Sequence, residues 1–222
     1  MSDFYALLIG IDYYNPKPDN YDHLQGCVRD IDKMGDFLER SLKHPSGQLK
    51  ITRLTSPIPD TNSTADVRSG REEKPPTYEN IVQAFKDITE SAQSGDLVYI
   101  HYSGHGGRVK TIFPDLKKGE ELYDELLVHM DVCKDGRYLR DVEMTTLLKR
   151  MTDKGLIVTV IFDSCHSGGA TRSDGAVRGS RNGGPDTHDR PIDSAVADRE
   201  TLAQNWQAVT KGEARDSWLP NY

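Results

Sequence analysis

Residues 160–169 read VIFDSCHSGG, an apolar run that reaches Cys165 and then turns on two glycines. Residues 98–107 read VYIHYSGHGG and have the same form around His105. A short hydrophobic segment followed by small, turn-forming residues is typical of a buried strand that ends in a loop. Two such ends, one carrying a thiol and the other an imidazole, predict a functional rim at the edge of a sheet.

Around these two strands, apolar runs and amphipathic stripes alternate along the chain. Strands are predicted at residues 4–11, 49–56, 97–102 and 156–162, and helices at residues 28–42, 78–88, 138–151 and 195–209. This order predicts an α/β fold with right-handed crossovers, a mainly parallel sheet and helices on both faces. Ligands of such sheets bind beyond the carboxyl ends of the strands, so we expect His105 and Cys165 to lie at the same rim.

Composition narrows the class of protein. The net charge of −7 disfavours nucleic acid as a partner. Only three cysteines are present, and their spacing indicates neither a disulfide framework nor a zinc site, which favours a reducing compartment. No apolar run approaches the length of a signal peptide or membrane span. We therefore expect a cytoplasmic or nuclear protein without a membrane partner.

The paired turns have the chemistry of a thiol hydrolase. A thiol attacks a carbonyl carbon as thiolate, and a nearby imidazole can take its proton. We assign this role to His105 rather than His166, because a neighbour along an extended chain points away from Cys165. The main-chain N–H groups of Gly106 and Cys165 are the expected oxyanion hole. The alternative is that Cys165 is only a buried core residue.

The stretches HYSGHGG and FDSCHSGG resemble the histidine and cysteine motifs of the caspase-like cysteine peptidases, peptidase C14, and most closely the metacaspases. The opening YALLIGIDYY and the later LQGCVRDID are similar to the same branch. The resemblance covers residues 4–169, the large catalytic subunit. It implies the caspase–hemoglobinase fold, a three-layer sandwich, with Cys165 as nucleophile and His105 as general base.

The resemblance also implies specificity for Arg or Lys before the cleaved bond. The matching pocket residues are Cys27, Asp30, Ser103 and Asp163. Two carboxylates in a pocket would bind a guanidinium and repel an acidic side chain. The structural alternative is that Asp30 simply belongs to the first turn of a helix.

Many metacaspases bind calcium, and the resemblance maps that site onto Asp124 and Asp141. The two remaining acidic positions fall on Val142 and Arg172. Calcium takes six to eight oxygen ligands, so this loss should weaken the site severely. We expect weak calcium binding or none, and no required cofactor.

Three regions are predicted: a catalytic domain at residues 1–170, a flexible linker at residues 171–194 and a helical segment at residues 195–222. The family's small subunit contributes further strands, and no strand pattern follows residue 195. The strand at residues 156–162 is therefore expected to be an exposed apolar edge that needs a small subunit or a further chain segment. The linker carries arginines that are either self-cleavage sites, as in a zymogen, or ordinary linker charges: Arg172, Arg178 and Arg181.

The leading functional hypothesis is a cysteine endopeptidase that cleaves protein substrates after Arg or Lys. The alternative is a catalytically silent, partner-dependent caspase-like adaptor within a larger assembly. Another thiol hydrolase, such as an esterase, is disfavoured because the flanking residues do not form the G-x-C-x-G nucleophile elbow.

Overall fold

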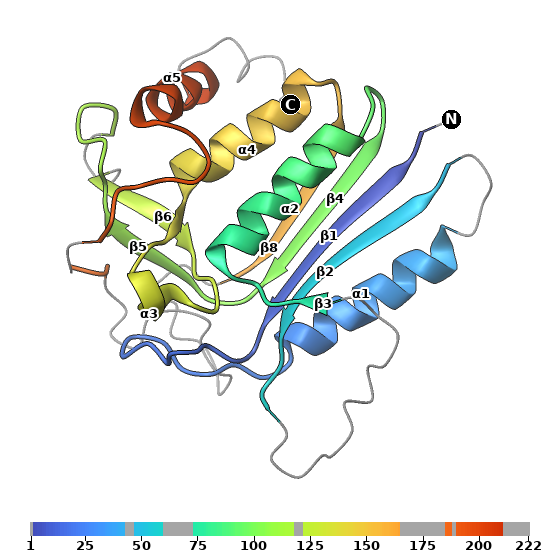
Figure 1. The fold of residues 1–222 in the computed structure, drawn as a ribbon, viewed down its shortest axis with the longest axis horizontal. Helices are drawn as coiled ribbons and strands as arrows, with labels where there is room; N and C mark the ends of the chain where they lie inside the picture. The colour runs from blue at the N-terminus through green and yellow to red at the C-terminus, as the bar shows by residue number, and fades with distance from the viewer. Residues whose placement is uncertain are drawn as a thin grey trace, which may run out of the picture.

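The computed structural model describes residues 2–42, 47–59, 73–117, 122–164, 185–187 and 190–210. Its centre is a five-stranded sheet in the order β3-β2-β1-β4-β8, in which every pairing is parallel (Figure 1). The strands are β1 (Phe4–Ile11), β2 (Leu49–Ser56), β3 (Glu73–Lys74), β4 (Leu97–Ser103) and β8 (Ile157–Asp163). The predicted parallel α/β sheet is confirmed.

Helices cover both faces of the sheet, which gives three layers. The helices next to the sheet are α1 (Cys27–Ser41), α2 (Tyr78–Ser91) and α4 (Asp141–Asp153). Leu7 and Ile9 of β1 belong to the large core cluster that also includes residues of α2 and α4. Ala6 and Leu8 point to the other face and pack in a second cluster with Ile31 of α1. Alternate side chains of one strand are thus buried on opposite faces, as expected for a strand inside a parallel sheet.

Local signals mark where the elements begin and end. Thr77 caps α2, because its side-chain oxygen accepts a hydrogen bond from the Asn80 N–H at 3.2 Å. After α4, Gly155 has a φ of 84°, a left-handed conformation that glycine adopts without a steric penalty. This turn leads the chain directly from α4 into β8.

A second, antiparallel sheet extends from the end of β4. Its strands are β5 (Gly106–Lys110), β6 (Tyr123–Leu127) and β7 (Leu139–Arg140), and the short helix α3 (Val132–Asp135) lies between the last two. The predicted helix at residues 138–151 therefore starts later than expected. Leu139 and Arg140 pair with β6 instead, and α4 begins at Asp141.

The C-terminal helix α5 (Arg199–Thr210) packs beside α4 (Figure 1). The segment before it is held against the core, since Asp186 accepts a hydrogen bond from the buried Tyr138 hydroxyl at 2.7 Å. Ser194 donates to Glu143 of α4 at 2.6 Å. Most of the predicted linker lies outside the described residues, so its boundaries stay a prediction.

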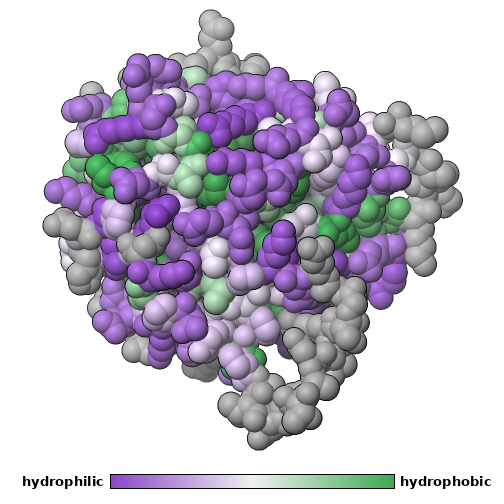
Figure 2. Space-filling view, viewed as in Figure 1, coloured by the Kyte–Doolittle hydropathy of each residue, from purple (hydrophilic) through white to green (hydrophobic). Residues whose placement is uncertain are grey.

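Strand β8 is the outermost strand of the main sheet among the described residues. Ile157, Ile161 and Phe162 are 57%, 40% and 45% exposed. By contrast, the face that carries α2 and α4 presents mainly hydrophilic side chains (Figure 2). The predicted apolar edge is therefore present. Within the described residues, the helices are too short or too polar to cross a membrane.

Candidate active site

The carboxyl ends of β4 and β8 lie side by side. Ser103 pairs with Asp163 in the strand register, and the chain reaches His105 two residues after Ser103. Ser164 is the last described residue before Cys165. Cys165 itself lies outside the described residues, as do Arg172, Arg178 and Arg181. The register nevertheless brings the strand that leads to Cys165 next to the strand that leads to His105, as expected from the sequence.

The His105 imidazole is buried between two tyrosines. The ring centroids of Tyr14 and Tyr21 lie 5.1 and 5.0 Å from that of His105. Burial raises the pKa of Tyr14 and raises the pKa of Tyr21 to about 12. Both phenols therefore stay neutral at physiological pH and hold the ring by packing.

A main-chain contact sets the tautomer of this imidazole. Its Nε2 atom lies 2.7 Å from the carbonyl oxygen of Asp22. Because a carbonyl oxygen only accepts hydrogen bonds, Nε2 carries the proton and Nδ1 carries the lone pair. Nδ1 is therefore the ring nitrogen that can accept a proton.

The backbone at His105 is anchored from both sides. The His105 N–H donates to the Tyr14 hydroxyl at 2.9 Å, and its carbonyl accepts from the Tyr102 hydroxyl at 2.6 Å and the Val128 N–H at 3.0 Å. The Val128 bond makes Gly106 and its β6 partner Leu127 a non-hydrogen-bonded antiparallel pair. The Gly106 N–H consequently points away from β6.

Two of the predicted pocket residues are in contact. The buried Ser103 hydroxyl donates to Asp163 Oδ2 at 3.1 Å. The Asp163 side chain is exposed at the end of β8, so its carboxylate is accessible from solvent.

The other two lie in the first turn of α1. Cys27 is buried, and its N–H donates to Asp12 Oδ1 at 2.8 Å. The Asp30 side chain is 36% exposed and lies 3.9 Å from Arg29 Nε. Gly10 of β1 pairs with Ser103 and allows this turn to approach, because a Cβ there would lie 3.0 Å from Val28 Cα.

Comparison with known proteins shows the family to which this chain belongs. The sequence model of the metacaspase, peptidase C14 domain matches residues 5–173. This chain belongs to the metacaspase family. It is 35% identical to metacaspase-1 of Meyerozyma guilliermondii over 165 residues, which are 74% of this chain and 35% of that protein. Metacaspase-1 of Schizosaccharomyces pombe is 33% identical over 165 residues, again 74% of this chain and 34% of the relative. The chain thus spans about a third of the length of these metacaspases.

A solved structure supports the fold. A crystal structure of a protein from Geobacter sulfurreducens superposes with a TM-score of 0.55 at 20% sequence identity, and covers 97% of this chain and 64% of that one. This likeness concerns the arrangement of the sheet and helices only.

Several residues that contact His105 or Cys27 were not found from the sequence. Asp12, Tyr14, Tyr21 and Asp22 all come from the segment after β1, more than 80 residues before His105. The available signal was their position, because a segment that follows a parallel strand's carboxyl end lies at the ligand-binding rim.

The two calcium candidates of this metacaspase are brought together. Asp124 of β6 and Asp141 at the start of α4 both accept hydrogen bonds from Lys117 Nζ. Burial and the Asp124 charge raise the pKa of Asp141 to about 6, although the Lys117 ammonium opposes the rise. A lysine thus lies where the resemblance implies a metal.

Proposed function

We propose that this chain is the catalytic part of a cysteine endopeptidase that cleaves after Arg or Lys, with Cys165 as nucleophile and His105 as base. The observation that carries the proposal is the His105 Nε2 contact with the Asp22 carbonyl oxygen. It leaves the Nδ1 lone pair to receive the thiol proton, at the rim toward which β8 leads.

In the first half-reaction, the Cys165 thiol gives its proton to His105 Nδ1, and the sulfur bonds to the substrate carbonyl carbon. The resulting oxyanion accepts hydrogen bonds from the N–H groups of Gly106 and Cys165. The orientation of the Gly106 N–H, away from β6, supports this role. The carbon–nitrogen bond then breaks, and the imidazolium protonates the leaving amine.

In the second half-reaction, His105 takes a proton from water, and the hydroxide oxygen attacks the thioester carbon. The carbon–sulfur bond breaks, the new carboxylic acid leaves, and the thiolate regains the proton from the imidazolium. The Asp22 carbonyl accepts a hydrogen bond from Nε2 throughout and stabilises the imidazolium by its negative end.

Specificity for a basic residue is supported by the exposed Asp163 carboxylate. The Ser103 hydroxyl, which donates to one of its oxygens, orients that carboxylate at the end of β8. A guanidinium would pair with it through charge-assisted hydrogen bonds. Asp30 in the first turn of α1 would supply the second negative charge of the pocket.

The exposed apolar side chains of β8 support a requirement for a partner strand beside it. An edge strand with unpaired backbone groups and large apolar side chains tends to pair with another strand. We propose a small subunit or a further chain segment as that partner. The same observation favours the second candidate function, a partner-dependent adaptor that binds through β8 without cleaving.

The test is cleavage of fluorogenic peptides ending in Arg, Lys or Asp by the wild-type chain, with Cys165→Ala as the matched control. Release after Arg or Lys that disappears in the control is expected. Cleavage only after Asp would contradict the acidic pocket. The assay is repeated with the small subunit of a full-length metacaspase added in trans. If no peptide is cleaved in that mixture, the adaptor is favoured.

A further inference from the structure

Lys117 is a buried lysine whose ammonium is surrounded by oxygen atoms. Its side chain is 1% exposed, and Nζ donates to Asp124 Oδ1 at 2.7 Å. It also contacts both carboxylate oxygens of Asp141, at 2.7 and 2.9 Å, and the carbonyl oxygen of Tyr123 at 3.3 Å. Burying an ammonium costs desolvation free energy unless anions and hydrogen-bond acceptors surround it. The oxygen atoms of Asp124, Asp141 and Tyr123 offset that cost for Lys117.

The oxygen atoms around Nζ are of the kind that a hard divalent cation takes as ligands. Carboxylates and main-chain carbonyls are the usual calcium ligands in proteins. The charges, however, are already balanced. Arg140 Nη1 donates to the second oxygen of Asp124 at 2.7 Å, so two cations face the two carboxylates. A divalent ion would have to displace the ammonium, which already occupies the space between the two carboxylates. The residues present do not fit a bound calcium ion.

We propose that the Lys117 ammonium takes the place of a divalent cation and holds β6 and α4 together. Asp124 lies in β6, Asp141 begins α4, and Lys117 ends the described part of the loop that follows β5. One side chain thereby links three segments that are separate in the sequence. The chain carries this cation covalently and needs no metal at this position.

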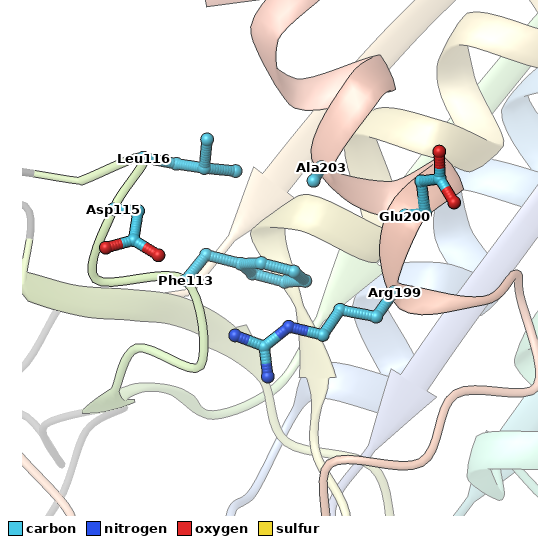
Figure 3. Close-up of a pocket in the computed structure, with 6 residues that line it drawn as sticks. All are labelled: Phe113, Asp115, Leu116, Arg199, Glu200 and Ala203. Carbon is cyan, nitrogen blue, oxygen red and sulfur yellow. The ribbon is translucent and has the colours of Figure 1, made fainter.

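The loop that carries Lys117 also packs against α5. The Lys117 ammonium lies 4.5 Å from the centre of the Trp206 ring, which is a cation–π contact. Phe113 and Leu116 of the loop face Ala203 of α5 across a pocket of about 380 Å³ (Figure 3). The Lys117 N–H donates to the Phe113 carbonyl at 3.2 Å, which closes the turn before the buried lysine.

The position of Trp206 permits a direct test with terbium(III), a luminescent substitute for calcium that a nearby indole sensitises. Wild type is titrated with terbium beside Lys117→Met, which removes the charge but keeps an unbranched side chain. Wild type should give no saturable indole-sensitised emission. Lys117→Met should give emission that calcium displaces and that disappears when Trp206→Phe is added.

Thermal unfolding provides the second readout. Removing one partner of a buried charge pair should lower the Tm of Lys117→Met in EDTA by roughly 6–20 °C. Calcium should then raise that Tm by several degrees at concentrations well above its Kd, by mass action. The Tm of wild type should not respond to calcium. Lys117→Arg keeps a cation and should resemble wild type in both readouts.

Each outcome decides the proposal. Saturable terbium emission in wild type that Trp206→Phe abolishes would overturn it. So would a folded Lys117→Met chain that gains neither emission nor calcium stabilisation. If Lys117→Met is unfolded in EDTA, refolding in calcium supports the proposal. A chain that stays unfolded in calcium, beside a folded Lys117→Arg, overturns it. None of these readouts uses peptide cleavage, so they are independent of the proposed peptidase activity.

Discussion

The Nε2 atom of His105 lies 2.7 Å from the main-chain carbonyl oxygen of Asp22. The contact joins the loop after β1 to the end of β4, across 83 residues of sequence. Because the acceptor is a main-chain atom, the tautomer of the proposed base depends on the path of the loop and not on the identity of its side chain.

This relationship predicts that Asp22→Ala retains peptidase activity. The Asp22 side chain is half exposed and pairs with the exposed Lys17 at 3.2 Å, a contact that contributes little. We expect kcat/KM within about threefold of wild type, as for most surface substitutions. His105→Ala, assayed beside it, should lose about 10²–10⁴ in rate. A large loss in Asp22→Ala with an unchanged Tm would mean that its carboxylate acts directly.

Gly107 and Tyr21 should be energetically coupled. A Cβ at Gly107 would overlap the Tyr21 hydroxyl oxygen, and Tyr21 packs on His105. Gly107→Ala should therefore displace the tyrosine and reduce kcat/KM by about 10-fold or more. Tyr21→Phe removes the obstructing oxygen, so Gly107→Ala should cost much less in that background. A double-mutant cycle of kcat/KM and Tm measures the coupling, and additive effects would contradict it.

Asp163→Asn should reduce cleavage after Arg. The change keeps the shape of the side chain but removes the charge that would pair with a guanidinium. We expect kcat/KM for Arg peptides to fall by about 30–1,000-fold, mainly through KM. Ser103→Ala removes only the orienting hydroxyl and should have a smaller effect. An equal loss on peptides that end in a neutral residue would show that Asp163 supports the site rather than selecting the substrate.

The exposed face of β8 should control association. Ile157→Lys and Ile161→Lys replace exposed side chains, so the free energy of unfolding should change by about 0.5 kcal/mol or less. Self-association, measured by light scattering, should decrease, since charges on an edge strand oppose pairing. Val158 packs against the core, and Val158→Lys should instead destabilise the fold by about 2 kcal/mol or more. Unchanged association in both exposed variants would exclude β8 as the contact.

Stability should depend on pH through Asp141. Its pKa is about 6 in the folded chain and near 3.8 when unfolded. Between these values the folded chain keeps a proton that the unfolded chain releases, so raising the pH through this window favours unfolding. The free energy of unfolding of wild type should therefore fall relative to Asp141→Asn from about pH 4 to pH 6 and then run parallel. Urea unfolding across this range checks the slope, and the opposite sign would mean that the Lys117 ammonium outweighs burial.

The main sheet was predictable because its strands carry their own signal. Strands such as residues 4–11 are buried on both faces, so nearly every residue of the strand is apolar and the run is visible in the sequence. The antiparallel strands β5 and β6, GGRVK and YDELL, are short and partly polar. They are strands chiefly because they pair with each other, and pairing partners are not visible in local composition.

The sequence by itself determined the parallel α/β architecture and the placement of His105 at the rim toward which the Cys165 strand leads. Both follow from local patterns: apolar runs, helical periodicity and strand-ending turns. Only the tertiary structure decided which groups surround His105 and which cation lies between Asp124 and Asp141. The tautomer depends on a carbonyl oxygen, which every residue carries, and the burial of Lys117 depends on segments that meet only after folding. Side-chain chemistry can be read along the chain, but the desolvation and pairing that give it a role are properties of the folded molecule.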